Sequence, residues 1–449
     1  MRAALTRAAG VAALVTLACA CSGSGGGGVP ASPTPVPTRT TSPPSANPPT
    51  HVVVIVQENR SFDNLFNGYP GAQTQDWGLD QHGNHIPLVP VALNAPFDVE
   101  HEHSSFVTEF DGGRMDGWSL VHTFCTRAPC TTQTPYSYVR PSDIKPYWAL
   151  AEQFGLADEM LQSNEGPSFA AHQYLIAGQS GHPWAMAGIP DKPTAGCGVP
   201  GATVAQINMD SAYPGMFGGV TSSCKNYPTV LDLLINKGLT WRYYTPFPTY
   251  LYNAPYASQH IYFGPTASND VTPEWTILSD IKAHALANVT YLVSRVQLTD
   301  HPGLNDGDGP YWIATVTNAI FTNPYYAKNT VVLVTWDDWG GLYDDVAPRH
   351  PDGLPTDPYE YGFRVPLLVV SPFVKTPHLV DHTPRDQTAI VHFIETTFGL
   401  PSLGELDAKT DDLSSMFDFT RTPLPYTKID TNGWVPTDAM RYPATQGED

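Results

Sequence analysis

The sequence predicts an α/β fold with a central, mainly parallel sheet flanked by helices, and two observations support this class. Short, continuous apolar runs rich in β-branched residues recur along the chain, as in strands that are covered on both faces. Segments of helical character lie between these runs, and this alternation is typical of layered α/β proteins. The chain of 449 residues is long enough for a large core in one such domain or two smaller ones.

The expected strands and helices follow one another along the chain. The strands are His51–Val56, Leu239–Tyr244, Val289–Val293, Thr330–Thr335 and Pro366–Val370. The helices are Pro146–Phe154, Thr229–Lys237, Tyr311–Phe321 and Asp386–Thr397. All five strand runs are interpreted as buried parallel strands, because none alternates between apolar and polar residues.

The middle of the chain, from Gly178 to Ala285, is rich in Gly, Pro, Tyr and Asn. This composition predicts long insertions that form a cap or rim rather than a separate domain. Aromatic residues gather there and would suit either an apolar rim or the core, and the core is the favoured interpretation. They are Trp241, Tyr243, Tyr244, Phe247, Tyr250 and Tyr252.

The N-terminal region does not have the pattern of a folded domain. Arg2 and Arg7 precede an apolar run from Ala8 to Ala20, which is the pattern of a signal peptide. Cys21 then opens a stretch of Gly, Ser, Pro and Thr that is expected to be a flexible tether. A cysteine in this place resembles a bacterial lipoprotein signal, so we expect export with a lipid anchor at Cys21, or free secretion after ordinary cleavage.

Cysteines and charge narrow the class further. Cys125, Cys130, Cys197 and Cys224 follow the signal region, and an even number in an exported chain suggests disulfides. The simplest pairing is Cys125–Cys130 and Cys197–Cys224. The formal net charge of −20 would be repelled by nucleic acid phosphates, so nucleic acid is not an expected partner.

Polar residues follow two of the expected strands directly. Glu58 and Asn59 follow the first strand, and Asp337 and Asp338 follow the strand at Thr330–Thr335. Ligands of open α/β sheets bind outside the carboxyl ends of the strands. Glu58 and Asn59 alone would be interpreted as a helix-start turn, and Asp337 and Asp338 alone would suit a solvated strand-end turn as well as a metal site. Together, three carboxylates and an amide in one crevice would require a cation, so they predict a metal site.

Histidines in polar segments are the candidate acid–base groups. His101 and His103 flank Glu102, and His301 follows the strand at Val289–Val293, beside Asp300. We expect Asp300 to orient the His301 imidazole. Most single histidines are structural, and His301 rises above that expectation because it follows a strand and lies beside Asp300. A serine esterase is poorly supported, because the Gln179-Ser180-Gly181 segment lacks the G-x-S-x-G pattern.

An ordered series of motifs resembles the phosphoesterase family of bacterial phospholipases C and related acid phosphatases. The blocks are Glu58–Asp63, Gly112–Gly117, Gly166–His172, Asp300–Pro302, Thr335–Gly341, Arg364–Pro366 with Ser371-Pro372, Gln387–Leu400 and Phe417–Phe419. Each block alone is weak, whereas the series spans nearly all of residues 51–420. The resemblance implies an alkaline-phosphatase-like fold and hydrolysis of a phosphoric ester.

The resemblance also implies a site. One divalent metal ion would be held by Glu58, Asn59, Asp337 and Asp338, with Ser168 as metal-activated nucleophile. Without the resemblance, Ser168 would be interpreted as a helix cap. Oxygen ligands suit Mg²⁺, Ca²⁺ or Mn²⁺ and also admit Zn²⁺.

The histidines receive roles from the same resemblance. His301 would stabilise or protonate the leaving oxygen, and His101 would contact the phosphoryl group. His103 and His260 are weaker candidates for the same work. The sequence departs from the family pattern at Trp339 and at other positions around the metal site, which leaves the substrate open between a phosphomonoester and a phospholipid.

The expected organisation has four parts. Residues 1–21 form a signal peptide, 22–50 a tether, 51–420 a phosphoesterase catalytic domain and 421–449 a C-terminal extension. The expected enzyme is an exported hydrolase, either a cell-surface lipoprotein or secreted. The competing hypothesis is a surface lipoprotein that binds a structural cation without catalysis.

Overall fold

The computed structural model describes residues 48–127, 130–181, 184–190, 195–208, 217–350, 361–435 and 437. Ser45–Asp449 form one compact unit, and the other unit, Met1–Pro44, lies outside the described residues. The expected signal peptide, the lipidation site at Cys21 and most of the tether therefore lie outside them as well. Among the described residues, no helix combines the length and apolar character that crossing a membrane requires.

An eight-stranded sheet forms the centre of the fold, in the order β14-β13-β15-β1-β16-β17-β8-β18. The strands are β1 (His51–Gln57), β8 (Gly155–Ala157), β13 (Trp241–Tyr244), β14 (Asp270–Val271), β15 (Val289–Val293), β16 (Thr330–Trp336), β17 (Leu367–Val370) and β18 (Leu379–Asp381). All neighbours pair in parallel except β17, which is antiparallel to β16 and β8. The expected mainly parallel α/β sheet is confirmed.

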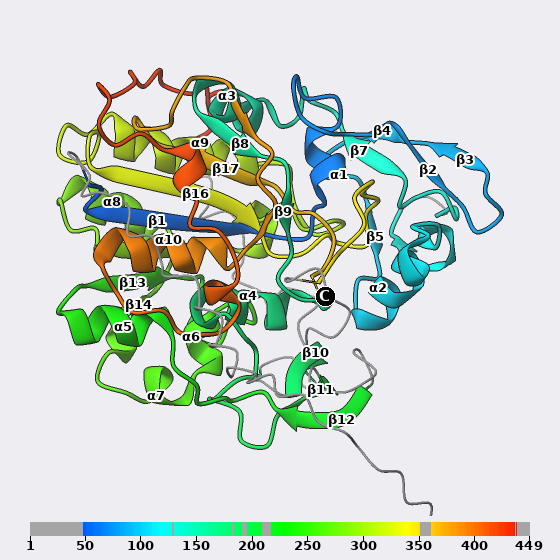
Figure 1. The fold of residues 1–449 in the computed structure, drawn as a ribbon, viewed down its shortest axis with the longest axis horizontal. Coiled ribbons are helices and arrows are strands. Elements are labelled where there is room, and N and C mark those ends of the chain that lie inside the picture. Colours follow the sequence, from blue (N-terminus) through cyan, green and yellow to red (C-terminus); the bar gives the residue numbers. More distant parts are fainter. Residues whose placement is uncertain are drawn as a thin grey trace, which may run out of the picture. The chain divides into compact units, whose positions relative to one another are not determined.

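The strands β1 and β16 lie side by side in the middle of the sheet (Figure 1). Val52 to Val56 are fully buried, as is the whole of β16, because layers of helices cover both faces. The prediction that Pro366–Val370 is a parallel strand is wrong, because β17 runs antiparallel. An apolar run buried on both faces has the same pattern in either direction, so the sequence carries no signal for the orientation.

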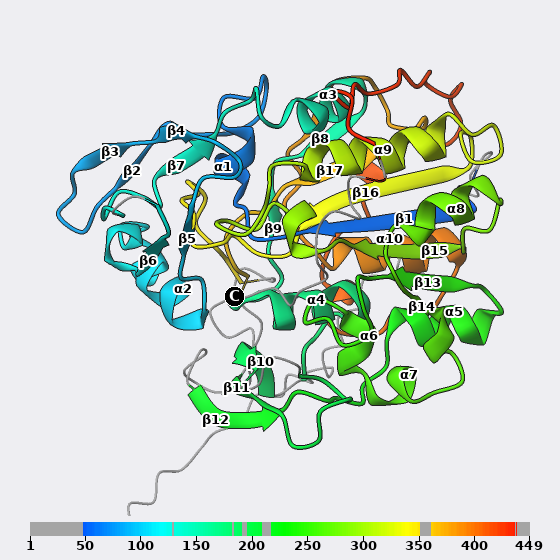
Figure 2. The same ribbon diagram turned by 180° about the vertical axis from the view of Figure 1, so that it is seen from behind.

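Helices pack in two groups, one on each face of the sheet (Figures 1 and 2). The first group contains α3 (Lys145–Gln153), α8 (Thr276–Lys282) and α9 (Gly309–Phe321). The second contains α4 (Ser168–Ala177), α5 (Val230–Lys237), α6 (Ala254–Ala257) and α10 (Ala389–Phe398). The four expected helices correspond to α3, α5, α9 and α10. A reciprocal cap between Thr229 and Asp232 starts α5.

Short helices and small sheets surround this core. The remaining helices are α1 (Phe62–Phe66), α2 (His103–Phe110) and α7 (Gln259–Tyr262). A separate three-stranded sheet contains β10 (Trp184–Pro190), β11 (Thr203–Asn208) and β12 (Phe217–Ser222). Two-stranded sheets pair β2 (Trp77–Leu79) with β3 (His85–Pro87), β4 (Val89–Val91) with β7 (Ser137–Val139), β5 (Phe97–Val99) with β6 (Thr123–Cys125), and β9 (Met160–Leu161) with β19 (Arg385–Asp386).

The middle of the chain contributes to the core as well as to the periphery. It supplies β13 and β14 to one edge of the main sheet and β10–β12 to the separate sheet. Five of its six singled-out aromatic residues are buried, and Phe247 packs against the same core, so the core interpretation is confirmed. Disulfides join Cys125 to Cys130 and Cys197 to Cys224, as expected.

Candidate active site

The polar residues that follow β1 and β16 meet at the carboxyl ends of these strands. Gln57 and Trp336 are register partners in the parallel pair, so Glu58 and Asp337 emerge side by side. The backbone N–H of Asn59 donates to Asp337 Oδ1 at 2.9 Å, and its side-chain amide donates to both oxygens of Asp338 at 3.0 and 3.1 Å. The expected convergence of three carboxylates and one amide is therefore present, in a fully buried position.

Backbone geometry allows the two strand ends to come this close. Asn59 adopts a left-handed conformation with φ of 61°, and Gly340 has φ of 64°. A Cβ on Gly340 would lie 2.2 Å from the Asn59 carbonyl oxygen, so only glycine fits there. The Gly340 N–H donates to Asp338 Oδ1 at 2.8 Å and holds that carboxylate in place.

Ser168 is brought to the same place from a different layer of the fold. It is the first residue of α4, after Pro167 as N-cap, and it is fully buried. Its Oγ donates to Asp338 Oδ2 at 3.1 Å and accepts from the Asn59 amide at 3.2 Å. The first turn of a helix presents free N–H groups, which favour an anion such as a phosphoryl group.

His172 also belongs to this cluster, although the sequence analysis gave it no role. It lies one turn after Ser168 on α4, with Nε2 2.9 Å from Glu58 Oε1 and 3.7 Å from Asp337 Oδ2. Burial lowers the pKa of His172 to about 4, so the imidazole is neutral near neutral pH. The spacing of four residues in Ser168–His172 is the signal that could have found it, because such residues share a helix face.

The donor set fits a divalent cation. Glu58, Asp337 and Asp338 are buried carboxylates, and the neutral His172 does not balance their charge. Asn59 Oδ1 and Asp337 Oδ2 are buried and receive no hydrogen bond from any of the described residues. Buried oxygen atoms without donors are costly, and a hard cation is the partner that such atoms accept.

Two of the predicted histidines lie beside this cluster. His101 Nε2 accepts from the Asn59 side-chain amide at 2.8 Å, and its Nδ1 donates to the Val99 carbonyl oxygen at 2.6 Å. The His301 ring centroid is 5.9 Å from that of His101. His301 Nδ1 lies 2.9 Å from the Pro302 carbonyl oxygen, while its buried Nε2 has no hydrogen-bond partner in the part of the chain that the structure describes. This nitrogen is therefore available to a bound substrate.

The expected role of Asp300 is wrong. Its carboxylate accepts hydrogen bonds from Tyr147 Oη at 2.8 Å and Trp336 Nε1 at 3.1 Å, and the Pro302 carbonyl oxygen contacts His301 instead. Asp300 has φ of 74°, a backbone turn that directs its side chain away from the neighbouring imidazole and into the core. Burial raises the pKa of Asp300 to about 6.

The two weaker histidine candidates lie in different places. His103 Nδ1 lies 3.2 Å from the carboxylate oxygen Oε2 of Glu165, a residue on the segment that leads to Ser168. His260 lies on α7 and contacts Asp232 at 2.9 Å and Asn226 at 2.7 Å. The structure therefore does not bring His260 to the cluster, because α7 packs beside α5 rather than at the strand ends.

Gln387 is a second residue that the sequence analysis did not single out. Its amide donates to the carbonyl oxygens of Trp336 at 2.6 Å and Asp337 at 2.8 Å. Its Oε1 accepts from the Ser163 N–H at 3.1 Å. It therefore links the loop after β16 to the segment that leads into α4. No local pattern marks such a residue, because its partners are distant in the sequence.

Trp339, which departs from the family pattern, is a buried wall of the site. Its indole N–H donates to Glu109 Oε2 at 2.6 Å, and its ring centroid lies 6.3 Å from that of His101. Burial raises the pKa of Glu109 well above its ordinary value. Trp339 is fully buried, so it shapes the position of His101 rather than contacting solvent.

Comparisons with known proteins identify the family of this chain. The model of the Phosphoesterase family matches residues 50–401. Phospholipase C A of Mycobacterium tuberculosis is 25% identical, over 83% of this chain and 78% of that protein. Non-hemolytic phospholipase C of Burkholderia pseudomallei is 24% identical, over 88% of this chain and 62% of that protein.

Among solved structures, a protein in the alkaline phosphatase superfamily from Vibrio parahaemolyticus is 11% identical with a TM-score of 0.38, over 85% of this chain and 75% of that one. The family match covers most of the chain and includes the whole cluster at the ends of β1 and β16. The chain belongs to the phosphoesterase family and is a hydrolase that acts on phosphoric ester bonds.

Proposed function

We propose that this enzyme cleaves phosphoric esters with Ser168 as nucleophile, through a phosphoserine, and with one divalent metal ion at the strand ends. The ion would be held by Glu58, Asn59, Asp337 and Asp338, with the serine oxygen beside it. The observation that supports the proposal most directly is the position of Ser168 Oγ, 3.1 Å from Asp338 and 3.2 Å from Asn59 in a buried cluster.

The residues divide the chemical work. When bound, the metal would neutralise the carboxylates and lower the pKa of the serine hydroxyl. Ser168 donates its proton toward Asp338 Oδ2 and its oxygen then bonds to phosphorus, while the bond from phosphorus to the leaving oxygen breaks. Water subsequently attacks phosphorus, the bond from phosphorus to Ser168 Oγ breaks, the phosphate product leaves, and the serine regains its proton from Asp338.

The two imidazoles act on either side of this step. His301 holds one proton on Nδ1 against the Pro302 carbonyl oxygen, so Nε2 is the atom that exchanges a proton with the leaving oxygen or with water. His101 is fixed by Val99 and Asn59, and it contacts the phosphoryl oxygens. His103, paired with Glu165, remains a weaker candidate for the same role.

The proposed substrate is a phospholipid-type phosphodiester. Its support is the set of relatives named phospholipases C, which align along most of this chain. A phosphomonoester is the alternative that the assay below separates. We also propose that the enzyme is exported, with a lipid anchor at Cys21 or by secretion, on the pattern of its N-terminal sequence.

Turnover of two chromogenic esters tests the proposal. Para-nitrophenyl phosphate and para-nitrophenyl phosphorylcholine are compared before and after chelation, with Mg²⁺, Ca²⁺, Mn²⁺ or Zn²⁺ restored singly. We expect chelation to stop turnover and one cation to restore it, with the phosphorylcholine ester hydrolysed faster. Faster cleavage of the monoester would instead identify a phosphatase.

Ser168→Ala is the decisive variant. We expect it to abolish turnover of both esters while the protein keeps its thermal unfolding temperature within a few degrees. Ser104→Ala, at an exposed serine, is the matched control and should retain full activity. Near-normal activity of Ser168→Ala would disprove the nucleophile assignment.

A further inference from the structure

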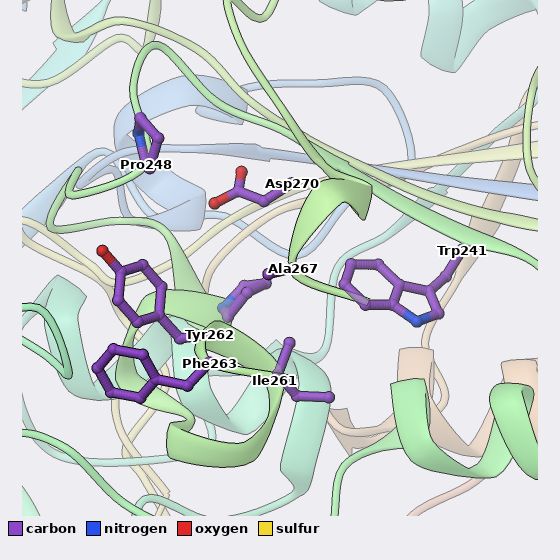
Figure 3. Close-up of a pocket in the computed structure, with 8 residues that line it drawn as sticks. Trp241, Pro248, Ile261, Tyr262, Phe263, Ala267 and Asp270 are labelled. Atoms are coloured by element: carbon purple, nitrogen blue, oxygen red, sulfur yellow. The ribbon is translucent and has the colours of Figure 1, made fainter. Parts of the chain in front are cut away.

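A pocket lies at the β14 edge of the main sheet, among residues that have no part in the candidate active site described above. It has a volume of about 350 Å³, near the lower end of the range for small-molecule sites. Figure 3 shows Trp241 on one side, Tyr262 and Phe263 on the other, and Asp270 between them. The pocket is therefore aromatic on two sides and acidic in the middle.

Asp270 is the polar group that defines the chemistry of this pocket. Its Oδ2 accepts from the Asn253 amide at 2.6 Å, while its Oδ1 is buried and has no hydrogen-bond partner among the residues described above. Burial raises the pKa of Asp270 to about 7. The Asn253 amide is neutral and does not balance the negative charge of this carboxylate. A cation that enters the pocket would therefore form an ion pair with Asp270.

The rings suit a particular kind of cation. Tyr262 and Phe263 meet edge to face, with ring centroids 4.9 Å apart and an interplanar angle of 72°, so they present two differently oriented surfaces. Phe263 lines the pocket and keeps 66% of its surface exposed, whereas Trp241 on the opposite side is buried. Aromatic surfaces attract organic cations through their ring quadrupoles, and quaternary ammonium groups bind in such surroundings.

We propose that this pocket is a binding site for a small organic ammonium cation, held by the Asp270 carboxylate and the rings of Trp241, Tyr262 and Phe263. Such a group occurs both as a free amine and as the headgroup of a zwitterionic lipid. The site does not depend on the proposed serine mechanism, because it shares no residue with the strand-end cluster, which is the group of buried polar residues at the ends of β1 and β16 that includes Glu58, Asp337 and Asp338.

One short segment connects this pocket to the catalytic cluster. Asn253, which bonds Asp270, follows Tyr252, whose ring stacks on His172 at 5.5 Å with an interplanar angle of 15°. His172 in turn contacts Glu58. Occupation of the pocket therefore has a short physical route to a predicted metal ligand, through consecutive residues rather than through a long path.

Isothermal titration of the full chain with choline and with tetramethylammonium tests the proposal directly. Dimethylbutanol, the uncharged carbon analogue of choline, is the ligand control. We expect saturable binding of both cations at one site, and at least tenfold weaker binding of the uncharged analogue. Absence of saturable binding of either cation would overturn the proposal, as would equal binding of the uncharged analogue.

Variants place the binding in this pocket. Asp270→Asn keeps the shape of the side chain and should weaken choline binding at least tenfold, and Trp241→Phe should weaken it by a smaller factor. Asp430→Asn, at an exposed carboxylate, is the matched control and should bind normally. Ser168→Ala should also bind normally, which separates this site from choline in the catalytic cluster. Unchanged binding by Asp270→Asn, with thermal unfolding showing a folded protein, would refute the assignment.

A vesicle experiment separates the two sources of the cation. Flotation with phosphatidylcholine vesicles is compared between the wild type and Asp270→Asn, with phosphatidylglycerol vesicles as control. Loss of flotation with phosphatidylcholine in the variant assigns the site to a lipid headgroup. Equal flotation, together with weakened choline binding, assigns it to a free amine.

Discussion

Two clusters of three acidic residues lie close together in this enzyme, and they are balanced in different ways. The strand-end cluster contains Glu58, Asp337 and Asp338. The second, which we name the Arg364 cluster, contains Asp63, Asp344 and Asp345 around Arg364. Both clusters come from the same two segments of chain. In the segment after β1, Glu58 belongs to the first cluster and Asp63, in α1, to the second. In the segment after β16, Asp337 and Asp338 are followed by Asp344 and Asp345.

In the Arg364 cluster, one guanidinium serves all three carboxylates. Arg364 Nε lies 2.7 Å from Asp344 Oδ1, and its Nη2 lies 2.5 Å from Asp345 and 3.6 Å from Asp63. The cation also packs over the Phe62 ring at 4.8 Å. Burial still raises the pKa of Asp344 to about 6, and burial with the neighbouring Asp344 raises that of Asp63 well above its ordinary value.

The strand-end cluster has an imidazole in the place where the other cluster has a guanidinium. His172 contacts Glu58 and Asp337, but burial keeps it neutral because its pKa falls to about 4. A fixed arginine makes a structural network, whereas a neutral histidine beside buried carboxylates leaves a demand for an external cation. The comparison teaches that counting acids does not identify a metal site, and that the charge of the partner decides.

Asp337→Asn should have the largest effect on activity. Loss of the negative charge of this carboxylate weakens binding of the cation. We therefore expect turnover to fall by roughly 10³-fold, which is equivalent to an increase of about 4 kcal/mol in the activation barrier. The matched variant in the other cluster, Asp344→Asn, should keep at least a third of the activity. Initial rates with para-nitrophenyl phosphorylcholine measure both. Equal losses in the two variants would remove the distinction between the clusters.

Arg364→Met should have the largest effect on stability. It leaves two buried carboxylates, Asp63 and Asp344, and the partly buried Asp345 without their cation, so the free energy of unfolding should fall by about 3–5 kcal/mol. Urea denaturation followed by circular dichroism measures this change. Arg364→Lys keeps the charge and should lose less, and a Met variant as stable as the wild type would contradict the structural role of the cluster.

A chelator should lower the stability of the folded protein only by removing the metal ion from the strand-end cluster. A metal present at about 100 times its dissociation constant stabilises the native state by about 2.7 kcal/mol, and chelation removes that contribution. Thermal unfolding with and without chelator should therefore differ in the wild type and in Asp344→Asn. It should not differ in Asp337→Asn, and a shift in that variant would place the cation elsewhere.

The pH dependence of stability gives a further test of the Arg364 cluster. Asp344 has an ordinary pKa of 3.8 and a pKa of about 6 in the folded protein, so the folded state binds more protons between these values. Its contribution to stability is full below pH 3.8 and is lost as the pH rises to about 6. The pKa difference of about 2 corresponds to a loss of about 3 kcal/mol, and Asp344→Asn should flatten the slope in urea denaturation measured from pH 4 to 7. An unchanged slope would show that Asp344 does not titrate in this range.

The sequence predicted the strand ends well because their signal is local. An apolar run followed directly by Glu58 or by Asp337 predicts both the strand and the polar group at its end. The disulfide pairs were also predictable, because few cysteines leave few pairings. Ser168 needed the family resemblance, since its own local pattern is that of a helix start.

The remaining features depend on residues that are far apart in the chain. The sequence predicted the direction of β17 and the partner of Asp300 wrongly, and it left the place of His260 open. Each of these features is decided by packing against distant elements.

By itself, the sequence determined the α/β class, the strands and the acids that follow them, because these depend on neighbouring residues. Only the tertiary structure decided which acids receive a cation from the chain itself. That choice depends on whether a guanidinium such as Arg364 or a neutral imidazole such as His172 arrives from another layer of the fold. Burial then sets the charge of each group, and burial is a property of the packed molecule rather than of any local segment.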